Sequence, residues 1–177
     1  MSNNIKNQFK QFVAPTYGRF PLTLDRGKGS YVWDSNDKKY LDLGGGIAVN
    51  CLGHSHPEIS QTLFEQSSRL IHCSNLYHFK GQSQLAENLS KRIGSGRVFF
   101  CNSGAESSEV MIKLARRSKQ VEGRFEIITA ENSFHGRTMA GISATGQEKV
   151  KDGFAPLLQG FSHVPFNNLD AIRSAIT

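Results

Sequence analysis

The sequence lacks a long apolar run, a leader-like start and a paired set of cysteines. No uninterrupted stretch of about 18 apolar residues occurs, so no membrane-spanning helix is predicted. The opening MSNNIKNQFKQFVAP has no apolar segment followed by a small-residue cleavage site, which argues against a secretory signal. Three widely spaced cysteines, Cys51, Cys73 and Cys101, do not suit a disulfide framework. These absences together favour a cytoplasmic protein.

Motifs for nucleotides and metals are also missing. Neither G-x-x-x-x-G-K-[ST] nor G-x-G-x-x-G occurs. His54, His56, His72 and Cys73 match no standard zinc spacing, so we expect no metal. The formal net charge of +6 would suit nucleic acid, but the cations are scattered along the chain. Their densest cluster, between residues 113 and 119, falls near the end of a predicted helix, where cations complement the helix dipole. We therefore expect no nucleic-acid partner.

What is present is a globular composition with a small all-β start. The 177 residues are 38% apolar, which is enough for a real core. The first ten residues are polar and are expected to be loosely ordered. Strands are predicted at 22–24, 30–34 and 39–43, with turns at 26–29 and 34–37. The first forty-odd residues should therefore form a small antiparallel unit.

Helices and strands alternate through the remainder. Helices are predicted from residue 57 and over 82–93. After them come a strand at 97–101, a helix at 104–120 and a strand at 125–130. A short helix near residue 139, a strand at 162–164 and a helix at 169–176 complete the pattern. Such alternation predicts an α/β fold with a parallel sheet, and nearly continuous apolar strands suit a sheet covered on both faces.

The junction after the strand at 97–101 raises a specific question. Ser103 and Glu106 have the S-x-x-E spacing of a capping box, which explains the junction by helix capping alone. The same geometry can also bind an anion, because a helix start exposes unpaired N–H groups and Gly104 permits close approach. The spacing leaves both interpretations open.

A second cluster of polar and aromatic residues follows the next strand. The segment 131–138, ENSFHGRT, is predicted to be a loop. If its strand neighbours the earlier one, both loops open at the same sheet edge. Phe134 would then stack on a flat ring whose phosphate lies at Ser103–Ala105, and Arg137 would clamp a carboxylate. The alternative is that Phe134 is a core residue and Arg137 is solvated.

These segments together resemble a known family. NSGAE, followed about thirty residues later by FHGRT, is similar to the class III aminotransferases, which depend on pyridoxal 5'-phosphate. The stretch 15–59 and the segment SNLYH at 74–78 resemble the acetylornithine branch of that family. The resemblance implies the N-terminal part of the fold type I transferases. Residues 1–52 would contribute to the small domain, and residues 53–177 would form the first part of the cofactor-binding large domain.

The resemblance also implies roles for individual residues. The phosphate of the cofactor would be held at one corner and its ring covered by one loop, while other residues contact substrate. The implied cofactor-binding residues are Ser103, Gly104, Ala105, Phe134, His135 and Gly136. The implied substrate-binding residues are Arg137 as the α-carboxylate clamp, Tyr17, Arg19, and Asn75 near a dimer interface.

The activity implied is transfer of an amino group between N-acetylornithine and 2-oxoglutarate, a step of arginine biosynthesis, in a homodimer. Alternatives are another ω-aminotransferase, acting on succinylornithine, ornithine or 4-aminobutyrate, and a non-catalytic module that binds phosphate or nucleic acid. In the family, the lysine that forms the Schiff base and the aspartate facing the ring nitrogen come later in the chain than Thr177. We therefore expect this segment to be an N-terminal half, inactive and unstable by itself.

Overall fold

The computed structural model describes residues 2–177, and their contacts divide the chain into two compact units. The first unit ends at Ser83 and the second comprises Gln84–Thr177. The boundary between residues 52 and 53, which the family resemblance implies, stays a prediction. None of the helices within residues 2–177 has the length and apolar character needed to cross a membrane.

The first unit begins with a helix where loose order was expected. Helix α1 (Ser2–Phe12) carries Ile5 and Phe9 four residues apart, and Val13 follows after the same interval. These three side chains line a cavity whose other wall is formed by residues 15–24. The expectation of loose order was wrong because it rested on polar composition, whereas a helical stripe needs only one apolar residue per turn.

A three-stranded antiparallel sheet follows, as predicted. It comprises β1 (Leu24–Lys28), β2 (Tyr31–Asp34) and β3 (Lys39–Leu41), paired in that order. The predicted turn at 26–29 was wrong, because β1 continues through Gly27 to Lys28 and the chain reverses only after it. Gly27 fits within the strand because the His54 ring lies where a side chain would be, 2.5 Å from an ideal Cβ position.

An acid–histidine pair connects this sheet to the glycine-rich segment after it. Asp42 pairs with His54 at 2.7 Å, and its other oxygen accepts the N–H groups of Gly44 and Gly45. The hydrogen bond from His54, followed by the one from Gly45, holds the pKa of Asp42 below its usual range. His54 is therefore engaged by a carboxylate, which the search for zinc spacings could not indicate.

The remaining elements of the first unit are short or helical. They are α2 (Gly45–Ala48), α3 (Pro57–Ser67) and the 3₁₀ helix η1 (Ser74–Leu76). Helix α3 begins at Pro57, as predicted, because proline has no N–H to leave unpaired at a helix start. Helix α4 (Lys80–Ile93) runs across the boundary between the two units.

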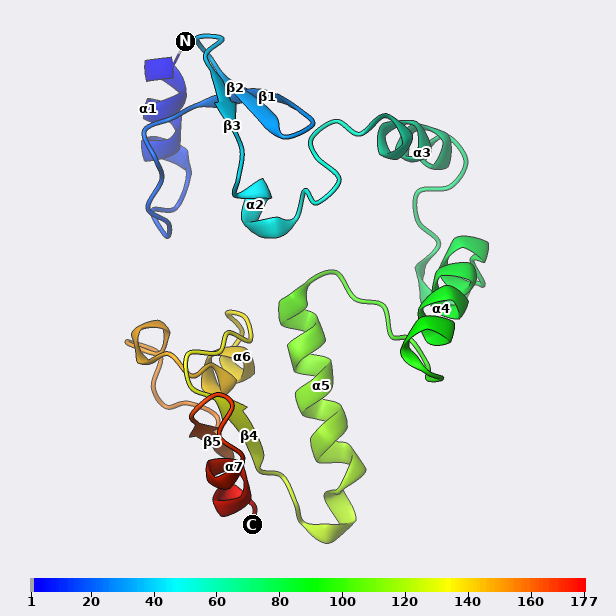
Figure 1. Cartoon of the computed structure of the whole chain (residues 1–177), viewed down its shortest axis with the longest axis vertical. Coiled ribbons are helices and arrows are strands. Elements are labelled where there is room, and N and C mark those ends of the chain that lie inside the picture. The colour runs from blue at the N-terminus through cyan, green and yellow to red at the C-terminus, as the bar shows by residue number, and fades with distance from the viewer. Residues whose placement is uncertain (1) are drawn as a thin grey trace. The chain divides into compact units, whose positions relative to one another are not determined.

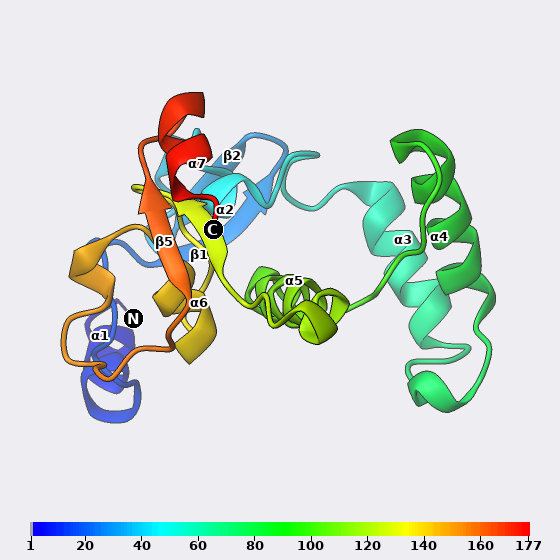
Figure 2. The same ribbon diagram turned by 90° about the horizontal axis from the view of Figure 1, so that it is seen from below.

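The second unit has the predicted alternation of helices and strands. Its helices are α5 (Gly104–Ser118), α6 (Met139–Ala144) and α7 (Leu169–Ala175), with 3₁₀ turns η2 (Gln120–Glu122) and η3 (Glu148–Val150). Strands β4 (Ile127–Ala130) and β5 (Phe161–Val164) pair in parallel, and they lie side by side in Figures 1 and 2. Helices α6 and α7 contact β5, and α5 contacts α6. The prediction of an α/β fold with parallel strands is confirmed.

The strand predicted at 97–101 does not form. Residues 97–101 have no regular secondary structure, and none of the strands within residues 2–177 pairs with them. The apolar pattern VFFC at 98–101 indicates only that the segment is suited to a sheet. A strand also needs a neighbour that accepts and donates its backbone hydrogen bonds, and a local pattern carries no information about that neighbour.

The buried core of the second unit is small. Ile112 of α5, with Ala140 and Ala144 of α6, forms a buried cluster against which Ile127 and Phe161 pack. This cluster fixes α5 and α6 against the two parallel strands. It therefore positions both the start of α5 and the loop that precedes α6, where the predicted site residues lie.

Candidate functional site

Ser103 caps the first turn of α5. Its Oγ accepts the N–H of Glu106 at 3.2 Å, so the predicted N-cap is confirmed. The Glu106 carboxylate reaches the N–H of Asn102 at 2.6 Å, one residue earlier than the capping box requires. That backbone hydrogen bond, aided by the Asn102 side chain, lowers the pKa of Glu106. Glu106 is therefore directed at the segment before the helix.

The corner formed by Ser103, Gly104 and Ala105 retains hydrogen-bond donors that have no partner in the described part of the chain. The N–H groups of Gly104 and Ala105 have no acceptor within residues 2–177. No heavy atom lies within 4 Å of an ideal Cβ position at Gly104, so space adjoins the backbone there. The Ser103 oxygen accepts a hydrogen bond, which leaves its hydroxyl proton able to donate one. Two open N–H groups, a hydroxyl and a helix start fit a phosphate monoester.

The loop after β4 lies directly against this corner. Gly136 has φ of 104°, and an ideal Cβ there would lie 2.8 Å from the Cβ of Ala105. The close approach requires glycine on both counts, because a side chain would be strained and would overlap Ala105. The two predicted loops are therefore in contact at Gly136 and Ala105, although no strand at 97–101 places them at a common sheet edge.

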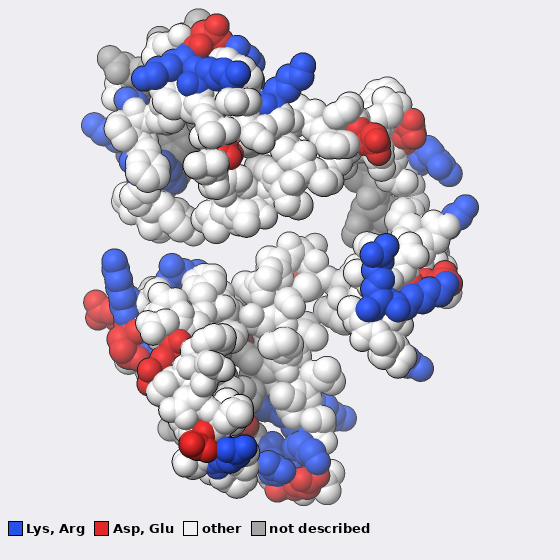
Figure 3. Space-filling model, viewed as in Figure 1, with Lys and Arg blue, Asp and Glu red and all other residues white. Residues whose placement is uncertain are grey.

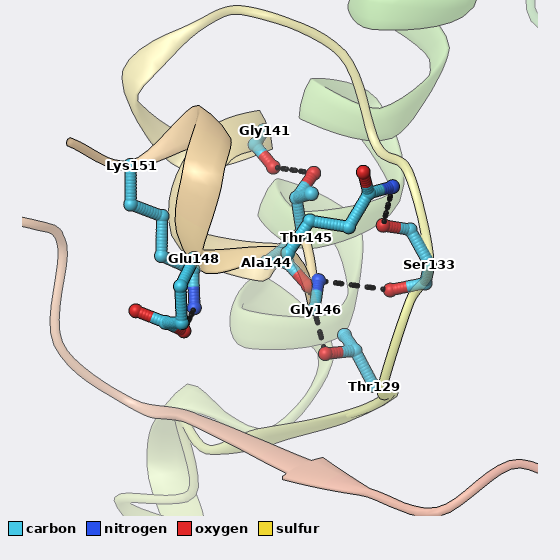
Figure 4. A network of polar contacts seen from close by, with 9 residues as sticks. Thr129, Ser133, Gly141, Ala144, Thr145, Gly146, Glu148 and Lys151 are labelled. Atoms are coloured by element: carbon cyan, nitrogen blue, oxygen red, sulfur yellow. Dashed lines mark hydrogen bonds and ion pairs between the residues drawn. The ribbon is translucent and has the colours of Figure 1, made fainter.

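Buried polar contacts hold this loop in place. Thr145 is fully buried, and its Oγ1 accepts the N–H of His135 at 2.9 Å while donating to the carbonyl of Gly141 at 2.8 Å. Ser133 accepts the N–H of Gly146 at 3.2 Å, and Thr129 donates to the carbonyl of Ala144 at 2.7 Å (Figure 4). Three of these hydrogen bonds join residues 10 to 15 positions apart, so they tie the loop to the end of α6 and hold its shape.

Phe134 and Arg137 project from the same loop. Phe134 is 58% exposed and does not belong to the buried cluster of the second unit. The Arg137 guanidinium carbon lies 5.2 Å from the centre of the Phe134 ring, which suits a cation–π contact. Arg137 pairs with no carboxylate among residues 2–177. An exposed guanidinium without a carboxylate partner is available to an anionic ligand, and it equally fits a solvated arginine.

The other predicted residues lie in the first unit. Tyr17 and Arg19 line the cavity of about 650 Å³ beside α1. The Arg19 guanidinium carbon lies 4.9 Å from the centre of the Phe9 ring. Asn75 is exposed in η1. The structure thus brings Tyr17 and Arg19 to one cavity, and it brings the loop that carries Phe134 and Arg137 into contact with Ala105 through Gly136.

Sequence reasoning missed Thr145. Thr145 is not a predicted cofactor- or substrate-binding residue, yet its buried hydroxyl accepts the N–H of His135, which is one. A threonine after a helix is common, so no local signal distinguishes it. Only its total burial together with two hydrogen bonds shows the role.

Comparison with known proteins gives the family. Residues 12–175 match the family described as aminotransferase class-III. The acetylornithine aminotransferase of Caldanaerobacter subterraneus subsp. tengcongensis is 49% identical over 170 residues, covering 94% of this chain and 43% of that protein. That of Gloeobacter violaceus is 48% identical over 176 residues, covering 98% and 44%. The chain therefore spans less than half the length of these relatives.

A solved structure agrees in fold. The ornithine aminotransferase of Toxoplasma gondii, described with partial occupancy of PLP at its active site, superposes with a TM-score of 0.93. The two sequences are 26% identical, and the match covers 99% of this chain and 42% of the Toxoplasma gondii chain. A family match across nearly the whole sequence, with this agreement in fold, is sufficient for an assignment. The chain belongs to the class III aminotransferases.

Proposed function

We propose that this chain forms the phosphate corner and the ring-facing loop of a pyridoxal phosphate site in an acetylornithine-type aminotransferase. The contact between Gly136 and Ala105 is the observation that carries the proposal, because it joins two separately predicted loops into one corner. The identities of 48–49% to acetylornithine enzymes favour N-acetylornithine and 2-oxoglutarate as substrates. A homodimer and a cytoplasmic location belong to the same proposal.

Different residues would bind the phosphate and the ring of the cofactor. Ser103, Gly104 and Ala105 would donate hydrogen bonds to the phosphate, and the α5 dipole would favour its charge. Phe134 would lie flat on the cofactor ring. His135 and Gly136 would shape the loop so that Phe134 is held against that ring. When bound, pyridoxal phosphate supplies the electron sink that amino-group transfer requires.

Arg137 would orient both substrates. Its guanidinium would bind the α-carboxylate that N-acetylornithine and 2-oxoglutarate share, and its contact with Phe134 would hold it beside the ring. Tyr17 and Arg19 would contact the distal part of the substrate, and Asn75 would lie near the dimer interface. These three roles rest on resemblance to the family.

The test uses a polypeptide of the relatives' full length that carries this segment. We expect kcat/KM to be highest for N-acetylornithine in a panel that also contains ornithine, succinylornithine and 4-aminobutyrate. Arg137→Ala should lower kcat/KM for N-acetylornithine and 2-oxoglutarate alike. The loss of one bidentate charged contact costs about 2–4 kcal/mol, roughly 30- to 700-fold.

Arg92→Ala is the matched control, because Arg92 is an exposed arginine of α4 outside the corner. It should leave both values unchanged. Equal kinetics in the Arg137→Ala variant and the wild type would remove Arg137 from the site. A clear preference for 4-aminobutyrate or ornithine would move the enzyme to another branch of the family.

A further inference from the structure

A second cationic cavity lies at the opposite end of α5 from the proposed cofactor corner. It has a volume of about 330 Å³. Its lining comes from the last turn of α5, from η2 and from the segment leading into β4, and consists of Arg116, Arg117, Gln120, Gly123, Arg124 and Phe125. Small-molecule sites usually have volumes of about 300–1,000 Å³, so the cavity is at the small end of that range.

Arg116 is held rigidly and has an unpaired donor. Its Nη2 donates to the carbonyl of Gln159 at 2.6 Å. Its guanidinium carbon lies 5.8 Å from the ring centre of Phe125 and 5.4 Å from that of Phe161. The Nε atom is buried and has no hydrogen-bond partner. The Nη1 atom makes no hydrogen bond within residues 2–177 and is not buried in this way, so it can donate to an acceptor from outside the protein.

The other two arginines also have spare donors. Arg117 donates from Nη1 to the neutral side chain of Gln120 at 3.0 Å. Arg124 faces Glu122 at 3.9 Å, which is too long for a hydrogen bond, and Glu122 is engaged by Lys119 at 2.7 Å. Neither Arg116 nor Arg117 pairs with a carboxylate within residues 2–177. Of the three arginines, only Arg124 lies near a carboxylate of the described chain, that of Glu122.

Three carbonyls at the end of α5 and in the turn after it accept backbone hydrogen bonds. The carbonyl of Arg117 accepts the N–H of Lys119, and the carbonyl of Gln120 accepts the N–H of Gly123. The carbonyl of Lys119 accepts the N–H groups of Glu122 and Arg124. These three carbonyls therefore already accept hydrogen bonds, while the charged side chains that line the cavity are all arginines.

The cavity is separate from the proposed cofactor corner. Helix α5 has 15 residues, and a helix of that length spans about 22 Å. Ser103 lies at its start and Arg117 in its last turn. Figure 3 shows Lys and Arg side chains together with acidic ones at the lower end of the view, over the end of α5 and the turn after it. An anion bound here would not compete with a phosphate at Ser103.

We propose that this arginine cavity binds a small phosphate-type anion with at least two negative charges, such as inorganic phosphate or pyrophosphate. Planar guanidinium groups match the oxygens of phosphate in pairs. The cations converge on one small concave site, whereas nucleic acid binding uses a stripe or an extended patch of cations. The inference is independent of the proposed aminotransferase activity.

The experiment is equilibrium dialysis against pyrophosphate, repeated with inorganic phosphate, of a full-length polypeptide that carries this segment and is loaded with pyridoxal phosphate, so that the proposed cofactor corner is already filled. We expect saturable binding at one site. The double variant Arg117→Gln/Arg124→Gln should raise the Kd of pyrophosphate by at least about tenfold, since charge-assisted hydrogen bonds are lost. Arg116→Lys keeps the charge but removes the planar fork, and it should also weaken binding.

Two controls separate this site from other sources of binding. Arg92→Gln/Lys113→Gln removes the same net charge from exposed positions that do not line the cavity, and it should leave the Kd unchanged. Ser103→Asp places a negative charge at the proposed cofactor corner, and it should leave binding at the arginine cavity intact. Far-UV circular dichroism checks that each variant keeps its helix content.

Three results would overturn the proposal. The first is the absence of saturable pyrophosphate binding by the wild-type chain. The second is equal weakening in the cavity variant and in the charge-matched control, which would show diffuse attraction only. The third is tighter binding of a short single-stranded oligonucleotide than of pyrophosphate, with affinity falling steeply with salt, which would assign the charge to nucleic acid.

Discussion

Gly136 and Ala105 are distant in the sequence, yet in the fold they leave no room for a methyl group between them. An ideal Cβ at Gly136 would lie 2.8 Å from the Cβ of Ala105, and the φ of 104° is one that side chains rarely adopt. Gly104, by contrast, adjoins open space. The two glycines therefore have different roles. Gly136 allows close packing against Ala105, and Gly104 leaves the backbone open to a ligand.

This contrast gives a prediction. Gly136→Ala should destabilise the second unit by about 2 kcal/mol or more, because strain and overlap add. Gly104→Ala should leave stability unchanged or slightly higher, since alanine is the better helix former. In a full-length enzyme Gly104→Ala should nevertheless weaken retention of pyridoxal phosphate. Urea unfolding measures the first two effects, and dialysis of the loaded enzyme measures the third.

The opposite pattern would contradict this view of the corner. A Gly136→Ala variant as stable as the wild type would mean that the loop can move away from Ala105. Full cofactor retention in Gly104→Ala would mean that the ligand does not approach the backbone there.

At the scale of elements, the start of α5 combines capping with the proposed ligand binding. The Ser103 oxygen serves the N–H of Glu106, while its proton remains for a ligand. Removing the side chain affects both functions at once. A substitution that keeps the cap but changes the charge can separate them.

Ser103→Ala should cost about 1 kcal/mol of stability through loss of the cap, and it should weaken cofactor retention. Ser103→Asp should keep the cap, because aspartate is an equally good N-cap residue. Its carboxylate should still expel the cofactor phosphate by repulsion. Cofactor retention at the wild-type level in Ser103→Asp would place the phosphate elsewhere, whatever the stability data show.

The turn between β2 and β3 depends on Asp34. Its carboxylate accepts the N–H groups of Asn36 and Lys38 and the hydroxyl of Tyr40 at 2.9–3.0 Å. Burial raises the pKa of Asp34, but these hydrogen bonds outweigh burial and the net pKa is lowered. A lowered pKa in the folded state means that the charged form stabilises the sheet. This contribution is present above the unfolded-state pKa of about 3.9 and is lost as the pH falls through the folded value.

Thermal unfolding followed by the fluorescence of Trp33, the one tryptophan of the chain, can test this. Asp34→Asn should lower the unfolding temperature at neutral pH, and the difference from wild type should shrink in acid. Tyr40→Phe, which removes one donor and leaves the carboxylate, should show a smaller change of the same sign. A difference that stays constant with pH would exclude the Asp34 charge as the cause.

The elements show what a local pattern can predict. Helices α3 and α5 begin where Pro57 and Ser103 indicate, because capping is decided within a few residues. The strand at 97–101 failed because pairing depends on a distant neighbour. The sequence indicated the two loops, whereas the Gly136–Ala105 contact and the buried support from Thr145 depend on tertiary structure, which spacing does not encode.

At the scale of the whole molecule, the described chain exposes much apolar surface. Its accessible surface is 14758 Å², while two separate compact units of half its mass would together expose about 10,000 Å². Large apolar side chains such as Phe20, Ile47, Phe99 and Leu114 are more than 60% exposed. Exposed apolar surface on this scale is typical of surfaces that other protein segments cover.

The isolated 177-residue chain should therefore self-associate. Light scattering coupled to size-exclusion chromatography should give a mass above the 19.6 kDa of one chain, increasing with concentration. The dye ANS should bind and fluoresce, because apolar surface is accessible. A monodisperse species of 19.6 kDa that unfolds cooperatively and binds no ANS would show that this surface is covered within one chain.

The most direct measurement is a crystal structure of a full-length polypeptide that carries this segment, grown with pyridoxal phosphate. The account predicts the phosphate within hydrogen-bond distance of the Gly104 and Ala105 N–H groups and of the Ser103 hydroxyl, with the Phe134 ring flat against the cofactor ring. A cofactor phosphate bound at any other place, with the N–H groups of Gly104 and Ala105 facing only water, would contradict it.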